Sequence, residues 1–205
     1  MTRIAVVDHG AGNLVSITQG LERVGAETVL AAGPHQLDGA DGVVLPGVGT
    51  PGAAMERLEQ AGFVDSLVDW TGPLLGICVG LQLFFEASSE DDSACLGLMP
   101  GRVERLRETP RLPHIGWNDL LMSAEDPLWE GLPDHPTFYF VHSYAPAPID
   151  SGLVIGEASY GARFCVAVRD GRRVGVQFHP ERSGANGLRV LSNFLAECRS
   201  GSEAC

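Results

Sequence analysis

A cysteine flanked by two glycines is the sharpest chemical feature of this sequence. The segment Gly76-Ile77-Cys78-Val79-Gly80 follows an apolar run typical of a buried strand and precedes residues with helical spacing. This is the context of a nucleophile elbow, in which the glycines leave room for a strained turn that exposes the nucleophile. The N-terminus of the following helix would favour the thiolate form of Cys78. The alternative is a buried core cysteine, which is common for unpaired thiols.

A histidine and a glutamate two positions apart could supply the base that such a thiol needs. His179-Pro180-Glu181 ends the apolar run 174–178. A nucleophilic thiol needs a group that takes its proton, and that group needs an orienting carboxylate. His179 is far from Cys78 in the sequence, but the carboxyl ends of strands in an open α/β sheet meet at one edge. Taken alone, a histidine after a strand is more often structural.

Glycine turns follow two other predicted strands. Pro46-Gly47-Val48-Gly49 could bring backbone N–H groups close to a ligand, which suits an oxyanion hole. Gly10-Ala11-Gly12 fails as a dinucleotide-binding motif because Val15 stands where a third glycine is needed. We expect neither a metal nor a cofactor, because the other histidines lack the helical spacing of metal ligands. These histidines are His35, His114, His135 and His142.

Composition narrows the class of protein. The 205 residues are 44% hydrophobic and 20% charged, which predicts a single domain over 1–205 with a full core. The net charge of −12 disfavours nucleic acid and anionic membranes as partners, and no apolar run approaches the ~18 residues of a membrane span. With no secretion signal at the start and no C-x-x-C pair, the odd number of cysteines predicts reduced thiols in the cytoplasm. The cysteines are Cys78, Cys95, Cys165, Cys198 and Cys205.

The hydrophobic pattern predicts an α/β fold, with a largely parallel sheet flanked by helices and an antiparallel extension. Predicted strands in the first half are 4–7, 27–31, 42–45 and 74–78, and predicted helices are 14–24, 53–60, 63–70 and 80–87. Predicted strands in the second half are 102–106, 118–122, 137–144, 153–159, 164–168 and 174–178, before a last helix around 188–198. The acidic segment 88–94 is predicted to be a solvated loop.

The cysteine and histidine motifs resemble those of the class I glutamine amidotransferases, which have a flavodoxin-like fold. The residues that carry this resemblance are Gly76-Ile77-Cys78-Val79-Gly80-Leu81-Gln82 and Val176-Gln177-Phe178-His179-Pro180-Glu181. Three further segments are similar to the glutaminase subunits of imidazole glycerol phosphate synthases. They are Asp8-His9-Gly10-Ala11-Gly12-Asn13-Leu14, Pro113-His114-Ile115-Gly116-Trp117-Asn118 and Tyr139-Phe140-Val141-His142-Ser143-Tyr144. The resemblance runs from position 4 to about 195.

This resemblance implies a Cys-His-Glu triad that acts on L-glutamine. Cys78 would attack the side-chain carboxamide and form a γ-glutamyl thioester. His179 would shuttle the proton, and Glu181 would hold the imidazole in its tautomer. The oxyanion would be bound by N–H groups from Val79 and from the Val48-Gly49 turn, where rotation of one peptide would switch the activity.

The resemblance also implies a pocket and a partner. Glutamine would be bound by Gly47, Gln82, His142, Ser143 and Tyr144. The ammonia would pass to a separate (β/α)₈ cyclase subunit in a heterodimer, which makes imidazole glycerol phosphate and aminoimidazole carboxamide ribotide in histidine biosynthesis. Asn13, Trp117 and Tyr139 lie in segments near that interface, although core packing would equally explain them.

Two departures from the family pattern and three rival functions remain. His9 replaces a usual tyrosine, and Thr50-Pro51 replaces a small residue and phenylalanine beside the predicted oxyanion turn.

The rival functions are a glutaminase subunit for another synthase, an inactive regulatory subunit, and a cysteine hydrolase or peptidase without a partner. The intact triad argues against inactivity, and the compact chain without a peptide groove argues against a peptidase.

Overall fold

A mainly parallel β-sheet forms the centre of the chain, which a computed structural model describes over residues 1–10 and 12–202. Its strands are β1 (Arg3–Val7), β2 (Glu27–Ala31), β3 (Gly42–Gly47), β4 (Leu74–Cys78), β9 (Leu121–Met122), β12 (Val154–Tyr160), β13 (Ala162–Asp170) and β14 (Arg173–Val176). In the described part their order is β2-β1-β3-β4-β14-β13-β12-β9. The first five run parallel, and the last three continue the sheet antiparallel.

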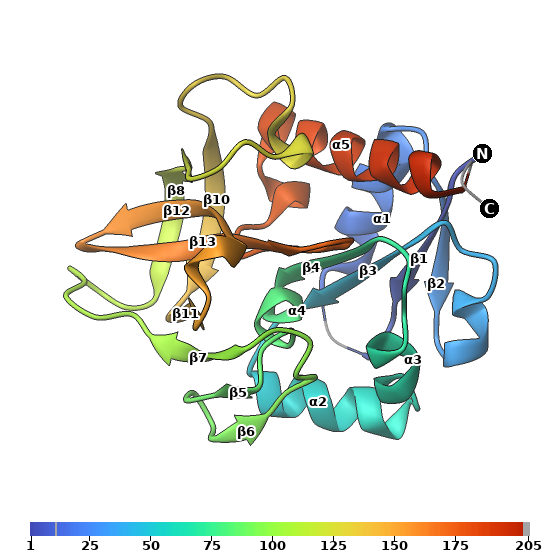
Figure 1. The fold of residues 1–205 in the computed structure, drawn as a ribbon, viewed down its shortest axis with the longest axis horizontal. Helices are drawn as coiled ribbons and strands as arrows, with labels where there is room; N and C mark the ends of the chain where they lie inside the picture. The colour runs from blue at the N-terminus through green and yellow to red at the C-terminus, as the bar shows by residue number, and fades with distance from the viewer. Residues whose placement is uncertain (11, 203–205) are drawn as a thin grey trace.

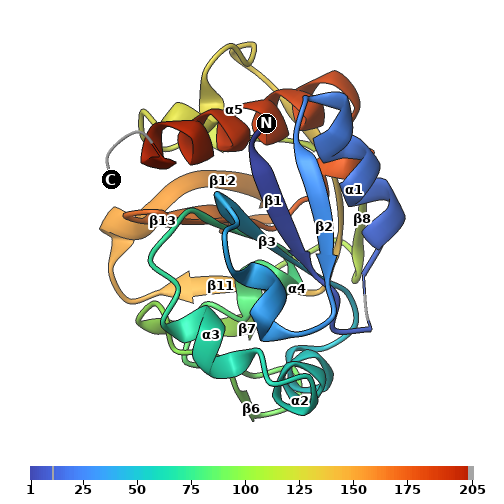
Figure 2. The same ribbon diagram turned by 90° about the vertical axis from the view of Figure 1, so that its right-hand side faces the viewer.

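Helices cover both faces of this sheet. The α-helices are α1 (Leu14–Arg23), α2 (Pro51–Gln60), α3 (Val64–Val68), α4 (Val79–Gln82) and α5 (Gly184–Ser202), and short 3₁₀ helices are η1 (Pro34–Leu37), η2 (Pro127–Trp129), η3 (Ser151–Leu153) and η4 (Pro180–Arg182). Figures 1 and 2 show α1 and α5 together on one face and α2 and α3 on the other. None of the helices in the described ranges is long and apolar enough to cross a membrane.

Two smaller sheets lie next to the antiparallel part of the large sheet, which contains β12 and β13 (Figure 1). Their strands are β5 (Ala87–Ser88), β6 (Ser93–Ala94), β7 (Gly101–Arg105), β8 (His114–Asp119), β10 (Thr137–His142) and β11 (Tyr144–Pro148). The strand predicted over 137–144 is divided at Ser143, because β10 pairs with β8 whereas β11 pairs with β7. The solvated loop predicted over 88–94 is wrong in part, since β5 and β6 form a small hairpin there.

Burial explains why the central strands are continuous apolar runs. Each residue of β3 and β4 is buried, as are the last four of β1, because helices cover both faces. Fully buried aromatic side chains fill the space between the layers, and each contributes roughly 1.5–3 kcal/mol to stability. These side chains are Phe63, Phe84, Phe85, Phe138, Phe140, Phe178 and Phe194.

The helix predicted over 80–87 is wrong beyond its first turn. It ends at Gln82 as α4, because the carbonyls of residues 83–85 accept hydrogen bonds from the backbone of 96–99 instead of from the next helical turn. The two adjacent phenylalanines of that segment are both fully buried, which one face of a regular helix cannot achieve. The dipole of such a short helix contributes less to a thiolate than a full helix would.

The predicted fold class is confirmed. The order β2-β1-β3-β4-β14 of the parallel strands is the flavodoxin-like order. Parallel strands end at the same edge, and register places Gly47 of β3 opposite Cys78 of β4, with Val176 of β14 opposite Ile77. The segments that follow these three strands therefore meet, and ligands bind at this edge in open α/β sheets.

Candidate active site

Cys78 occupies a strained turn between β4 and α4. Its backbone has φ +56° and ψ −110°, a conformation that costs a non-glycine residue about 1–3 kcal/mol and is typical of functional sites. The flanking glycines allow this turn. A Cβ at Gly80 would overlap the carbonyl oxygen of Leu45, and one at Gly76 would lie 2.8 Å from the Gly80 carbonyl oxygen. The sequence Gly-x-Cys-x-Gly is therefore required by packing as well as by chemistry.

His179 and Glu181 form a buried pair just after β14. The His179 Nδ1 lies 2.9 Å from Oε1 of Glu181, with little of either side chain exposed. Burial alone would lower the pKa of His179, but the adjacent Cys78 and Glu181 side chains outweigh it and raise that pKa to about 10. The other ring nitrogen, Nε2, is buried without a hydrogen-bond partner in the described residues. This arrangement favours an imidazolium beside the thiol.

The backbone of His179 is tied to strand β10. Its N–H donates to the carbonyl of Tyr139 at 3.0 Å, and its carbonyl accepts from the Ser183 hydroxyl at 2.6 Å. The same Ser183 oxygen accepts the Tyr139 N–H at 3.0 Å. The turn that carries His179 is therefore joined to the strand that carries Tyr139 by one direct backbone hydrogen bond and by two hydrogen bonds through the Ser183 hydroxyl.

A pocket of about 340 Å³ opens at the carboxyl ends of β3 and β4. This volume is within the usual range for a small-molecule site. Both Cys78 and His179 line it, together with most of the predicted substrate and oxyanion residues. Those residues are Val48, Gly49, Val79, Gln82, His142, Ser143 and Tyr144.

Gly47 is the one predicted pocket residue that the described lining does not include. A Cβ there would lie 2.8 Å from the Val79 Cβ, so Gly47 lets β3 approach α4 closely. The turn continues with Gly49 at φ +87°, a conformation that favours glycine. Val48 between them is 42% exposed.

The two departures from the family pattern support this turn. Thr50 is the N-cap of α2, since its hydroxyl accepts the Ala53 N–H, and Pro51 stands at the first helical position, which proline suits. His9 is buried with Nε2 2.9 Å from the Pro46 carbonyl oxygen. Burial lowers the pKa of His9, so a neutral imidazole donates to that carbonyl and holds the end of β3.

Two glutamines link the thiol to the pocket wall, and motif reasoning missed one of them. The Gln177 amide donates to the Cys78 sulfur at 3.5 Å, and its Oε1 accepts from the Gln82 amide at 3.1 Å. The Gln82 Oε1 is buried without a partner among the described residues, which leaves an acceptor for a ligand. Gln177 stands two residues before His179 in β-type sequence, so alternation alone could have placed it on the same side.

Glu90 is a second residue that the sequence analysis missed. It lies in the hairpin segment predicted to be solvated, but it lines the same pocket as Cys78. Burial raises the pKa of Glu90, and the neighbouring Asp91 carboxylate raises it further. Asp91 accepts the Gly52 N–H at 2.8 Å, which fixes the hairpin against the start of α2. Glu90 thereby gives the pocket a carboxylate.

The three residues predicted at a partner interface lie outside this pocket. Asn13 is exposed and caps α1. Trp117 is 58% exposed and lies edge-on to the Tyr139 ring at 6.2 Å. The Arg182 guanidinium lies 4.3 Å above the same tyrosine ring. Exposed aromatic rings of this kind are enriched in protein interfaces, so the geometry is compatible with the prediction without testing it.

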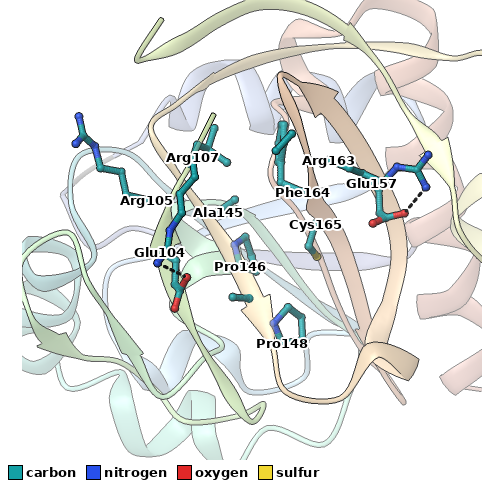
Figure 3. A pocket seen from close by; sticks show the side chains of 13 residues that line it. Glu104, Arg105, Arg107, Ala145, Pro146, Pro148, Glu157, Arg163, Phe164 and Cys165 are labelled. Atoms are coloured by element: carbon teal, nitrogen blue, oxygen red, sulfur yellow. Dashed lines mark hydrogen bonds and ion pairs between the residues drawn. The ribbon is translucent and has the colours of Figure 1, made fainter. Parts of the chain in front are cut away.

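Another pocket of about 340 Å³, which the triad residues do not line, lies between β7, β11 and β13 (Figure 3). Its thiol, Cys165, has a pKa raised to about 12 by burial and is therefore inert. Glu157 pairs with Arg163 across its rim. Across residues 1–10 and 12–202, no group of three or more His, Cys, Asp or Glu side chains could hold a metal ion.

Comparison with known proteins identifies the family to which this chain belongs. Residues 5–198 match the family described as Glutamine amidotransferase class-I. The chain belongs to this family. It is 46% identical to the "Imidazole glycerol phosphate synthase subunit HisH" of Synechococcus sp. (strain JA-3-3Ab), over 94% of this chain and 93% of that one. A protein of the same name from Halobacterium salinarum is 47% identical over 95% of this chain and 93% of its own.

Solved structures agree on the fold. A putative GMP synthase protein from Thermoplasma acidophilum superposes with a TM-score of 0.80, covering 99% of this chain and 96% of that one. A structure described as a glutamine amidotransferase gives 0.74 over 96% and 98%. Sequence identity is 22% in both cases, so these likenesses concern the fold alone.

Proposed function

We propose that this chain is the glutaminase subunit of an imidazole glycerol phosphate synthase. It hydrolyses L-glutamine to glutamate and ammonia, and a cyclase subunit uses the ammonia in histidine biosynthesis. The observation that carries the chemistry is a cysteine on a strained elbow, in one pocket with a histidine whose pKa is raised to about 10. The full-length relatives named as subunits of that synthase support the pathway.

In the first half-reaction the Cys78 thiolate adds to the carboxamide carbon of glutamine. The developing oxyanion is bound by the N–H of Val79 and by an N–H of the Val48-Gly49 turn, and one such donor is worth about 10²–10³ in rate. The His179 imidazolium gives its Nε2 proton to the departing nitrogen. The C–N bond breaks, ammonia leaves, and a γ-glutamyl thioester remains on Cys78.

In the second half-reaction water attacks the thioester. Neutral His179 takes a proton from the water, the C–S bond breaks, and glutamate leaves. The thiolate–imidazolium pair is thereby restored. Glu181 stabilises the imidazolium of the free enzyme, and in both half-reactions its carboxylate accepts the Nδ1–H of His179.

The pocket supplies matching groups for a free amino acid. The Glu90 carboxylate and the unpartnered Gln82 Oε1 are acceptors for the α-ammonium group or the carboxamide N–H₂ of glutamine. The walls formed by His142, Ser143 and Tyr144 complete the enclosure. Charge-assisted hydrogen bonds of this kind favour a zwitterionic substrate over a peptide.

A route for the ammonia begins behind the triad. A hollow of about 10 Å³ is lined by Asn13, Gly47, Val48, His179 and Glu181. This volume is close to that of one small molecule such as water or ammonia. It lies between the triad and the exposed Asn13, so we place the (β/α)₈ cyclase over Asn13, Trp117 and Tyr139. Activation by this partner would act on the Val48-Gly49 peptide.

We further propose that the heterodimer works in the cytoplasm, where thiols stay reduced. All four cysteines in the described part of the chain are free. Burial raises the pKa of Cys95 to about 11 and that of Cys198 to about 12, which keeps these thiols protonated and unreactive at neutral pH. The reactive chemistry is then confined to Cys78.

The test is Cys78→Ala in complex with the cyclase subunit. Glutamine-dependent synthesis should disappear, and ammonia-dependent synthesis should persist because the cyclase is untouched. Loss of both activities would show that Cys78 supports assembly instead. Failure to co-purify with a (β/α)₈ cyclase, with retained glutaminase activity, would assign the chain to another synthase.

A further inference from the structure

A chain of side-chain hydrogen bonds runs from strand β8 into the wall of the pocket. The Asn118 Nδ2 lies 3.3 Å from His114 Nε2, and His114 Nδ1 lies 3.1 Å from His142 Nε2. The other nitrogen of His142, Nδ1, lies 2.8 Å from the carbonyl oxygen of Tyr144. We call Asn118, His114 and His142 the imidazole relay.

The same carbonyl connects the relay to the nucleophile. The Tyr144 oxygen also accepts from Gln82 Nε2 at 3.1 Å. Gln82 Nε2 donates in addition to Gln177 Oε1, and Gln177 Nε2 donates to the Cys78 sulfur. An unbroken path of hydrogen bonds therefore joins Asn118 to the thiol.

The directions of these bonds follow from elementary valence. A carbonyl only accepts, so His142 must carry its proton on Nδ1 and offer a lone pair at Nε2. His114 must then donate from Nδ1 and accept at Nε2, where the Asn118 amide donates. Asn118 cannot reverse its amide, because Nδ2 also donates to the Ser159 carbonyl at 2.9 Å and Oδ1 accepts the Asp119 N–H at 2.8 Å. Each imidazole is neutral and has one tautomer.

The surroundings of the relay keep it neutral. The rings of His114 and His142 are buried, and burial lowers the pKa of His142 to about 4. The Tyr160 ring stacks on His114 at 4.2 Å, and Phe140 stacks on it at 5.1 Å. His142 from β10 bonds to His114 and Tyr160 from β12 stacks on it, and the charge of His179 lowers the pKa of His142 further.

We propose that the imidazole relay positions the Cys78 thiol by fixing the Tyr144 carbonyl from which Gln82 and Gln177 are oriented. This inference rests on the proposed glutaminase function and extends it. Asn118 is adjacent to Trp117 on β8, the exposed residue that we place against the cyclase. Docking at that strand is thereby connected to the nucleophile through hydrogen-bonded side chains, of which Asn118 and His114 lie outside the described lining of the pocket.

The first test is Asn118→Ala in the full chain, alone and with the cyclase. Removing the donor frees His114 to change tautomer, so we expect kcat for glutamine hydrolysis to fall about 10- to 100-fold through misplacement of the thiol. KM should change by less than about threefold. The matched control is Asn193→Ala, which removes an amide that donates to the Leu128 and Glu130 carbonyls far from the pocket. The control should lower stability but leave kcat unchanged.

The second test is Asn118→Asp, which a merely structural role would not predict. A carboxylate at this position accepts from His114 Nε2, so the relay is complete only while His114 is an imidazolium. Activity should approach the wild-type value at low pH and fall to the Asn118→Ala value as pH rises and His114 loses its proton. The wild type should lack this step. The lost donor to Ser159 is common to both variants and cancels.

The outcomes separate the two proposals. A wild-type complex that does not hydrolyse glutamine refutes the proposed function, whatever the variants do. An active wild type with Asn118→Ala at full kcat refutes the relay alone. Should Asn118→Ala fold poorly, the pH profile of Asn118→Asp and the rate of iodoacetamide alkylation at the Cys78 peptide decide, and wild-type behaviour in both overturns the relay.

Discussion

Replacing Glu181 with glutamine removes one charge from the centre of the site and little volume. A glutamine can still accept the Nδ1–H of His179, so the tautomer is kept and the Coulomb attraction is lost. The partner atoms lie 2.9 Å apart in a buried pair. At an effective dielectric constant of about 20, the Coulomb attraction at this distance is about 6 kcal/mol, part of which desolvation offsets. We expect kcat for glutamine hydrolysis to fall about 10²- to 10³-fold.

The raised pKa of His179 determines in which direction the pH dependence of activity should change in Glu181→Gln. The folded-state pKa of His179 is about 10, above its usual 6.5, so the stability it contributes is present below pH 6.5 and is lost as pH rises through 10. In Glu181→Gln that pKa falls, and the alkaline loss of glutaminase activity should begin at lower pH. A glutamate-release assay with the cyclase across pH 6–10 measures both effects.

Two controls distinguish the loss of this particular carboxylate from a failure to assemble and from a general effect of removing a charge. Ammonia-dependent synthesis should be unchanged, which shows that the cyclase is active, and co-purification of the Glu181→Gln chain with the cyclase shows that the complex assembles. Glu197→Gln removes a carboxylate from the ion pair with Arg169, at the opposite edge of the sheet, and should leave kcat unaltered. A Glu181→Gln enzyme within threefold of wild type, with an unmoved alkaline limb, would refute the assigned role of the carboxylate.

Three further changes test other parts of the structure. Gly80→Ala should lower the free energy of unfolding by about 1–3 kcal/mol in urea and abolish glutaminase activity, because its methyl overlaps the Leu45 carbonyl. Glu90→Gln should raise KM for glutamine about 10- to 100-fold in steady-state assays, with a smaller change in kcat. Arg169→Met should cost about 3–5 kcal/mol by chemical denaturation, because it leaves two carboxylates unpaired, without altering kcat.

Each of these has a result that contradicts it. A fully active Gly80→Ala protein would mean that the elbow tolerates a side chain. An unchanged KM in Glu90→Gln would place the substrate ammonium elsewhere in the pocket. Unaltered stability in Arg169→Met would show that the ion pairs contribute nothing net.

The sequence predicted the parts of the site that have local signatures. The glycines around Cys78 and the residues His179 and Glu181 are close in sequence to what they serve, so their types and spacing suffice. Gln177 was missed although its alternation with His179 could have placed it, whereas Glu90 was missed because its position depends on contacts far along the chain. Glu90 reaches the pocket only because Asp91 fixes the hairpin to α2.

For the fold, too, the elements with local sequence signals were predicted and those set by distant contacts were not. The strands β2 and β4 have the predicted bounds, because each is a short run of mainly apolar residues between turns. The helix predicted over 80–87 fails since its carbonyls bond to the segment 96–99, which no local pattern reveals. The division at Ser143 is equally nonlocal, because the two halves of one apolar run pair with different strands.

The shared hydroxyl of Ser183 couples the backbone of Tyr139 directly to that of His179. It bonds both the Tyr139 amide and the His179 carbonyl, while the amide of His179 bonds back to Tyr139. A displacement of Tyr139 would therefore shift the backbone of His179 directly, because hydrogen bonds join the two residues without a flexible segment between them. If β10 forms the partner interface proposed above, substitutions in that interface must keep these three hydrogen bonds or shift the position of His179.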